Sequence, residues 1–196
     1  QQSEIQKRKL NFNLNKKEDC LTLGFSTFFL NRTNRSGILK AGVIGGKNQD
    51  GNYKMDCRFN KEDLIQRIEL ISGKRDSIFL YNLDAIDFID KVIKKTRNSL
   101  VFFDPPYYKK GPALYTNFYK HENHIELANA LRYKMNNRNW LLTYDTAPEI
   151  KEIYKSLNLN SIEYYLNYSI SNPKVGREFM YFSKKLNVEN YKDFLR

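Results

Sequence analysis

An apolar run that stops at an acidic residue followed by two prolines is the feature that most limits how this chain can fold. Residues 99–103 have the composition of a buried strand, and Asp104, Pro105, Pro106 and Tyr107 follow them directly. Proline has no backbone N–H and disfavours the helical region for the residue before it, so no helix can begin here in the usual way. The sequence therefore predicts a strand that ends in a stiff, extended turn.

Strand-like and helix-like segments alternate on both sides of this turn. Asn60 is a natural N-cap for a helix in which Leu64, Ile65, Ile68 and Ile71 keep helical spacing, and we expect Thr146 to cap another helix. Residues 39–59 carry four of the nine glycines and predict loops with a short hairpin. Five strands are expected, the last two as a hairpin, at residues 77–82, 99–103, 139–144, 161–170 and 177–183. This order predicts an α/β sheet with crossovers, whose last two strands are antiparallel.

The charge of the chain bears on its partners. With 196 residues, the chain is long enough for one substantial core, and its net charge of +11 favours phosphate-rich partners, nucleic acid first and an anionic membrane second. The alternative is that much of this charge is simply solvated. Cys20 and Cys57 form no CxxC pair, so they suggest neither a disulfide framework nor a zinc site, which fits a cytoplasmic protein.

Aspartates follow three of the expected strands, at Asp84, Asp104 and Asp145. In open α/β sheets, ligands bind outside the carboxyl ends of the strands, so the three acids would line one rim. An aspartate after a strand also commonly caps the next helix, which is the favoured interpretation for Asp145 and an equal alternative for Asp84. Asp104 has no helix to cap, because the two prolines follow it.

The turn at Asp104 has the chemistry to hold an amino group. Its carboxylate and the carbonyl of Pro105 are two acceptors in fixed positions, and Tyr107 places a flat ring beside them. Two acceptors that draw the hydrogens of an NH2 group out of its ring plane leave the nitrogen lone pair available to attack an electrophile. The exocyclic amino group of a nucleic-acid base fits this description.

Asp-Pro-Pro-Tyr after an apolar strand resembles the signature of S-adenosylmethionine-dependent methyltransferases that act on exocyclic amino groups of bases, and its aspartate form resembles the adenine-specific enzymes. The segments FFLNRTNRSGI and GNYKMDCRFN are similar to the target-recognition region of Dam-like adenine methyltransferases, and YNLDAIDFI resembles their cofactor-adenine strand. The resemblance covers most of residues 20–185.

The resemblance implies a fold and a division of the chain. The expected fold is α/β, a Rossmann-like S-adenosylmethionine-dependent methyltransferase sheet with a C-terminal antiparallel hairpin, plus a small target-recognition segment. The lead-in and recognition segment would occupy residues 1–73, and the C-terminal part of the catalytic domain residues 74–196. The glycine-rich cofactor loop of the family is not found in this sequence. We therefore expect the chain to be N-terminally incomplete and not to bind cofactor alone.

The resemblance also implies an activity, which is methyl transfer from S-adenosylmethionine to adenine in double-stranded DNA after base flipping. The context would be a restriction-modification or DNA-marking system, with a restriction endonuclease as a possible partner. The alternatives are a non-catalytic DNA-binding fragment and an amino-methyltransferase acting on RNA or on a protein amide. The residues implied are Asp104, Pro105, Pro106 and Tyr107 for catalysis; Asp84, Ala85 and Asp104 for the cofactor; and Asn31, Arg32, Arg35, Arg58, Lys109 and Lys110 for nucleic acid.

His121 and His124 form an HxxH pair with glutamates nearby. Such a pair on one helix can hold a metal, but a third ligand is not evident in the sequence. The favoured interpretation is a solvated helix start, and no metal is expected for amino methylation.

Overall fold

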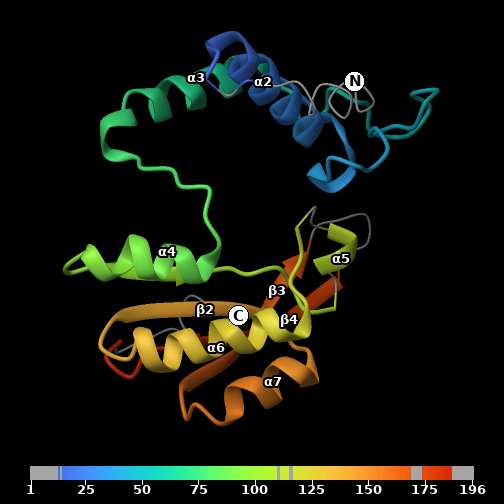
Figure 1. The fold of residues 1–196 in the computed structure, drawn as a ribbon. Coiled ribbons are helices and arrows are strands. Elements are labelled where there is room, and N and C mark those ends of the chain that lie inside the picture. The colour runs from blue at the N-terminus through green and yellow to red at the C-terminus, as the bar shows by residue number, and fades with distance from the viewer. Residues whose placement is uncertain (1–12, 14, 110, 115–116, 169–173, 187–196) are drawn as a thin grey trace. The chain divides into compact units, whose positions relative to one another are not determined.

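The computed structural model describes residues 13, 15–109, 111–114, 117–168 and 174–186. The chain forms two compact units, Gln1–Leu80 and Tyr81–Arg196, whose elements are labelled in Figure 1. In its described residues, no helix is both long enough and apolar enough to cross a membrane.

In the residues that the structure describes, the N-terminal unit contains α2 (Lys17–Thr33) and α3 (Lys61–Ser72) and two short 3-10 turns, η1 (Arg35–Gly37) and η2 (Arg75–Ser77). The expected start of α3 is confirmed, because the Asn60 side chain accepts a hydrogen bond from the N–H of Asp63 at 3.3 Å. The hairpin expected within residues 39–59 is wrong. These residues form successive turns, with an isolated β-bridge between Asn34 and Val43.

The C-terminal unit is built on a mixed sheet of four strands, in the order β1-β2-β4-β3. β1 (Leu100–Phe103) pairs in parallel with β2 (Asn139–Asp145). β4 (Lys174–Phe182) runs antiparallel both to β2 and to β3 (Asn160–Tyr168). The expected parallel crossover and the antiparallel C-terminal pair are therefore both present.

Helices cover one face of this sheet. α6 (His121–Lys134) packs against α4 (Ala85–Lys91) and against α7 (Pro148–Lys155), as Figure 1 shows. Two shorter helical segments are η3 (Ile93–Lys95) and α5 (Gly111–Leu114). In β1 the side chains of Val101 and Phe103 enter the core, whereas those of Leu100 and Phe102 on the opposite face are exposed.

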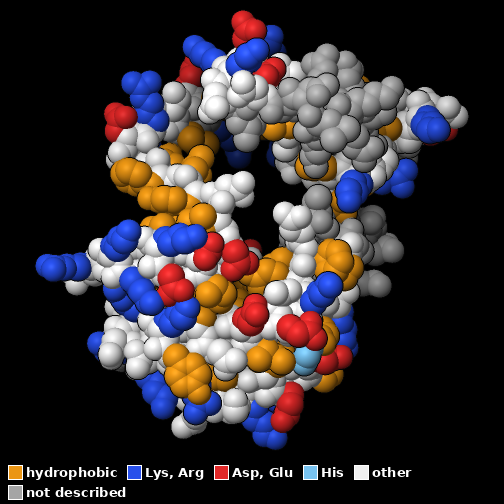
Figure 2. All heavy atoms as spheres, viewed as in Figure 1, with side chains coloured by type: hydrophobic (Ala, Val, Ile, Leu, Met, Phe, Trp, Pro, Cys, Tyr) orange, Lys and Arg blue, Asp and Glu red, His pale blue; other side chains and the backbone are white. Residues whose placement is uncertain are grey.

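The strand expected at residues 77–82 is wrong. Arg75–Ser77 is the 3-10 turn η2, and residues 78–84 continue without β pairing. The side chains of Phe79 and Leu80 are 75% and 90% exposed, and Figure 2 shows hydrophobic side chains gathered at the surface along this segment. An apolar, β-prone run predicts a strand only if a partner edge is available, and no local pattern reveals that edge.

Candidate active site

The turn that follows β1 holds the residues predicted to be catalytic. Asp104 is exposed, Pro105 is buried, and Pro106 and Tyr107 are partly buried. The next helix, α5, begins only at Gly111, whose N–H donates to the carbonyl of Tyr107 at 2.8 Å. The turn is therefore an irregular segment, as the prolines predict, and its carboxylate faces solvent instead of packing inward.

A buried threonine orients this carboxylate. Phe103 pairs with Leu142 in the parallel register of β1 and β2, so Asp104 and Thr143 come next to each other at the following position. The Thr143 hydroxyl, on a residue only 5% exposed, donates to Oδ1 of Asp104 at 3.1 Å. The exposed carboxylate thus has a rigid support from the neighbouring strand.

Asp145 fixes the second half of the turn. Its Oδ1 accepts from the N–H of Tyr108 at 3.0 Å, and its Oδ2 accepts from the N–H of Lys109 at 3.2 Å. The favoured interpretation of Asp145 as a helix cap is wrong. The N-cap of α7 is Ala147, so the cap expected at Thr146 is wrong as well. Both carboxylate oxygens satisfy backbone donors of a segment 36 and 37 residues away in the chain.

Tyr107 is anchored through its hydroxyl by a residue that sequence reasoning missed. The phenol donates to Oε1 of Glu178 on β4, and the hydroxyl of Tyr164 on β3 donates to Oε2 at 2.7 Å. Glu178 is only 3% exposed and is paired in register with Asp145 on one side and Tyr164 on the other. The available signal was an acidic residue within the apolar and aromatic strand REFMYF, where burial demands hydrogen-bond partners.

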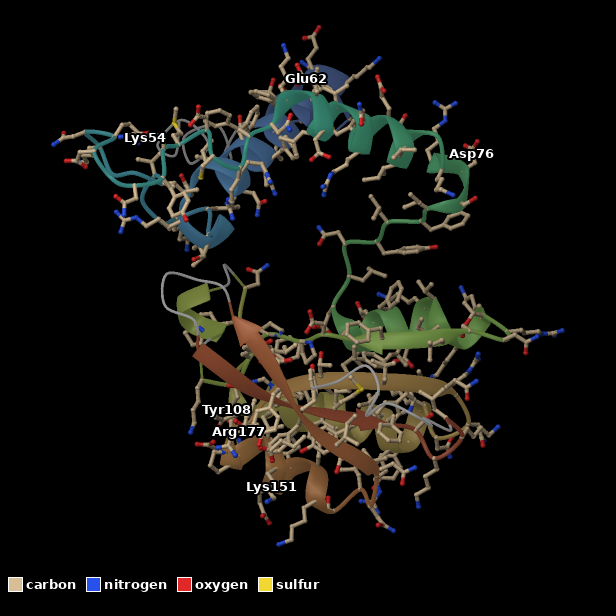
Figure 3. All side chains as sticks on the ribbon, turned by 180° about the vertical axis from the view of Figure 1, so that it is seen from behind. Lys54, Glu62, Asp76, Tyr108, Lys151 and Arg177 are labelled. Carbon is tan, nitrogen blue, oxygen red and sulfur yellow. The ribbon has the colours of Figure 1, made fainter. Side chains whose placement is uncertain are left out.

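A layer of buried aromatic residues lies beneath the turn. The ring of His124 lies 5.0 Å from the ring of Tyr108 between centroids, and its Nδ1 is 2.7 Å from the hydroxyl of Tyr144 (Tyr108 is labelled in Figure 3). Burial lowers the pKa of His124 to about 4, against the opposing charge of Asp145. Burial likewise raises the pKa of Tyr144. Both side chains are therefore neutral at pH 7.

The expected solvated start of α6 is right for His121 and wrong for His124. His121 is exposed, with Nδ1 3.0 Å from the hydroxyl of Tyr108, whereas His124 is fully buried. The hydrogen-bond partner of His121 is thus Tyr108, and that of His124 is Tyr144. Across the residues that the structure describes, no group of three or more His, Cys, Asp or Glu side chains is arranged to hold a metal ion.

The two residues predicted only for the cofactor lie at the start of α4. Oδ1 of Asp84 accepts from the N–H of Ile86 at 2.8 Å, so Asp84 is the N-cap of the helix and Ala85 is its first residue. Asp84 is exposed, and its charge helps burial to raise the pKa of Tyr119. Tyr119 in turn contacts the ring of His124. Asp84 thus belongs to the same acidic and aromatic region as the turn.

The residues predicted to contact nucleic acid are divided between the two units. Asn31, Arg32, Arg35 and Arg58 belong to the N-terminal unit, where Arg35 and Asn31 are exposed. Lys109 is exposed in the turn of the C-terminal unit, and Lys110 lies outside the described residues.

Two of these arginines have a structural task. Nε of Arg32 donates to the carbonyl of Arg58 at 2.8 Å, and Nε of Arg58 donates to the carbonyl of Arg32 at 3.2 Å. Arg58 also donates through Nη2 to the carbonyls of Asn31 and Asn34, at 2.6 and 3.1 Å. The bonds from Arg58 to Asn31 and Arg32 satisfy carbonyls in the last turn of α2, which have no partner within the helix itself, and the bond to Asn34 reaches its C-cap.

The fold and the turn together define an α/β protein with an acidic and aromatic site at the carboxyl end of a parallel strand. Residues 4–169 match the model of the family described as D12 class N6 adenine-specific DNA methyltransferase. The chain therefore belongs to this family, whose members are methyltransferases specific for adenine in DNA. None of the curated proteins matches the chain.

Proposed function

We propose that this protein transfers a methyl group from S-adenosylmethionine to the exocyclic amino nitrogen of adenine, at a specific sequence in double-stranded DNA. The observation that carries the proposal is the placement of Asp104. Asp104 is exposed at the end of β1, its carboxylate is oriented by Thr143, and Pro105, Pro106 and Tyr107 follow it directly, in a chain of the adenine-specific family.

The Asp104 carboxylate and the Pro105 carbonyl accept the two hydrogens of the target amino group, while the ring of Tyr107 stacks on the base. Both acceptors are held in place before the reaction, Asp104 by Thr143 and the turn by Asp145. The rate enhancement comes mainly from this positioning and from fixed dipoles, with no covalent enzyme intermediate. An adenine in a duplex is stacked and paired, so it must leave the stack to reach the turn.

The exposed carboxylates suit the proposed cofactor. When bound, S-adenosylmethionine supplies an electrophilic methyl group on a positively charged sulfur. Asp84 and Asp104 are exposed acids in one unit, and carboxylates accept hydrogen bonds from hydroxyl and amino groups. The residues that would hold the cofactor are Asp84, Ala85 and Asp104.

We further propose that the sheet is part of a Rossmann-like methyltransferase sheet, and that the N-terminal unit carries the target-recognition segment. The net charge of +11 supports DNA affinity through phosphate contacts, which should weaken steeply with salt. Methylation at a defined sequence is also the protective activity of a restriction-modification system, so a restriction endonuclease is the proposed partner.

Substitution of Asp104 tests the proposed function. We expect Asp104→Ala to lower labelled methyl transfer to DNA by at least roughly a thousandfold, because one of the two fixed acceptors is lost. Non-specific DNA binding, measured by fluorescence anisotropy, should stay within about twofold, since phosphate contacts dominate it. Asp76→Ala, at an exposed aspartate of the N-terminal unit, is the matched control and should retain activity.

The same assay separates the alternatives when DNA, RNA and protein are offered to the unaltered protein. Transfer to RNA or to a protein amide instead of DNA would contradict the proposed substrate. DNA binding without any transfer would indicate a non-catalytic binding module. Loss of both DNA binding and transfer in Asp104→Ala would contradict the role given to Asp104.

A further inference from the structure

The hydroxyl of Tyr107 has a fixed acceptor deep in the C-terminal unit. Glu178 lies on β4, 71 residues further along the chain, and accepts the phenol hydrogen on Oε1. The residue is 3% exposed, so this contact is shielded from water. A hydrogen bond to a carboxylate in such surroundings is stronger than one between neutral groups.

The backbone of Tyr107 is fixed as well. Its carbonyl accepts from the N–H of Gly111 at 2.8 Å, and the N–H of the next residue, Tyr108, donates to Asp145. With the main chain held on both sides, the remaining freedom of Tyr107 is rotation about its side-chain torsions. The bond to Glu178 fixes the position of the far end of the ring, and because a phenol O–H prefers to lie in the ring plane, it also favours one orientation of that plane.

Glu178 is itself held from the opposite side. Tyr164 is its antiparallel partner on β3, is 8% exposed, and donates to Oε2 at 2.7 Å. Each carboxylate oxygen of Glu178 therefore accepts a hydrogen bond from one phenol. The bond from Tyr164 holds the carboxylate in place, so the acceptor for Tyr107 is fixed. Burying a carboxylate within an aromatic strand is costly for stability, so the presence of Glu178 at this position points to a role other than packing.

We propose that Glu178 is a positioning residue for methyl transfer: it holds the ring of Tyr107 in the orientation that stacks on the target adenine beside the two acceptors of the turn. This inference rests on the proposed function. Glu178 acts through Tyr107 and does not itself touch the base or the cofactor.

The test compares Glu178→Gln, Tyr107→Phe and the double variant in the complete gene product, with steady-state methylation of DNA. Glutamine keeps the shape of glutamate but offers one acceptor oxygen for two phenols, and phenylalanine keeps the stacking ring without its hydroxyl. Each single variant should lower kcat roughly tenfold, with KM for DNA within about twofold of the unaltered protein. The double variant should be no slower than the slower single variant, because both changes remove the same bond.

Glu163→Gln is the matched control. Glu163 lies one residue from Tyr164 on β3, and its Oε1 pairs with Nη1 of Arg177 at 3.0 Å on an exposed surface (Arg177 is labelled in Figure 3). Its kcat should equal that of the unaltered protein. A kcat of Glu178→Gln equal to that of Glu163→Gln, or additive losses in the double variant, would overturn the proposal.

A second readout does not depend on catalysis. Carbon-13 NMR of labelled tyrosine should show a changed Cζ chemical shift for Tyr107 in Glu178→Gln, because the phenol loses its carboxylate acceptor. An unchanged shift would show that Glu178 does not hold the hydroxyl of Tyr107. If the unaltered protein transfers no methyl group to DNA, the proposed function fails, while the NMR comparison still decides the role of Glu178. If Glu178→Gln does not fold, an unchanged kcat in Tyr107→Phe overturns the proposal.

Discussion

The two units of this protein are stabilised in different ways. Among the described residues, the largest fully buried side chains lie in the C-terminal unit, where Trp140, Tyr144 and Tyr154 belong to the core of a four-stranded sheet and its helices. The N-terminal unit buries Leu30 and Leu64 and depends on side-chain bonds to backbone carbonyls at the end of α2. Apolar burial contributes most of the stability of a fold, so the units should differ in how much a single substitution costs.

The two units also differ in how far their helices bury apolar side chains. Ile65, Ile68 and Ile71 of α3 are 43%, 52% and 61% exposed, although their spacing is that of an amphipathic helix. In the C-terminal unit, Leu127 and Leu131 of α6 are 1% exposed. The sheet supplies α6 with a surface to cover, and the described part of the N-terminal unit supplies α3 with much less.

The largest expected effect tests the core of the C-terminal unit. Trp140 is 1% exposed, its Nε1 donates to the carbonyl of Met135 at 3.2 Å, and its ring meets Phe103 edge to face. Trp140→Ala should lower the free energy of unfolding by about 4 kcal/mol, measured by urea denaturation. Phe79→Ala, at an exposed ring of the N-terminal unit, should cost less than about 0.5 kcal/mol. Equal losses of unfolding free energy in Trp140→Ala and Phe79→Ala would contradict the proposed difference between the units.

The second effect is a pH dependence that belongs to the C-terminal unit. Burial lowers the pKa of His124 to about 4, so between that pH and the ordinary pKa of 6.5 the unfolded chain binds a proton that the folded chain does not. Stability is therefore present above pH 6.5 and is lost as the pH falls. From pH 7.5 to pH 5, the loss should be about 2 kcal/mol in urea denaturation.

Variants of the two histidines check the source of this dependence. His124→Gln should remove it, because the titrating group is gone. His121→Gln should retain it, because His121 is exposed. A pH dependence that survives in His124→Gln would assign it to another group.

The smallest effect concerns the N-terminal unit. Arg58→Ala removes the hydrogen bonds from its guanidinium to the carbonyls of Asn31, Arg32 and Asn34 and should cost about 1 kcal/mol of local stability. Amide hydrogen exchange at the C-terminal end of α2 measures this local loss, and the amides of the C-terminal unit should remain protected.

Arg58→Lys separates the structural task of Arg58 from a role in DNA binding. Lysine keeps the charge but not the planar set of donors, so hydrogen exchange should be as fast as in Arg58→Ala. Recovery of non-specific DNA affinity in Arg58→Lys would show that charge alone acts on DNA. Full protection of α2 in either variant would contradict the structural task.

Local patterns predicted much of the fold. The strands expected at residues 99–103 and 139–144 are present as β1 (Leu100–Phe103) and β2 (Asn139–Asp145), the C-terminal hairpin is present, and α3 begins after Asn60. The failures share one cause. The strand expected at residues 77–82 and the hairpin within residues 39–59 both depend on a second segment to pair with, and no local pattern shows where that segment lies.

In the candidate site, too, the sequence predicted one part and only the tertiary structure showed the other. The sequence by itself determined the turn: Pro105 and Pro106 exclude a helix after Asp104, because a proline ring fixes its own torsion, restricts the residue before it and removes a donor. Only the tertiary structure decided what supports the turn. Thr143, Asp145 and Glu178 reach it through strand registers that join segments 36 to 71 residues apart. Register is a property of paired strands and of the core they share, so a single stretch of chain does not contain it.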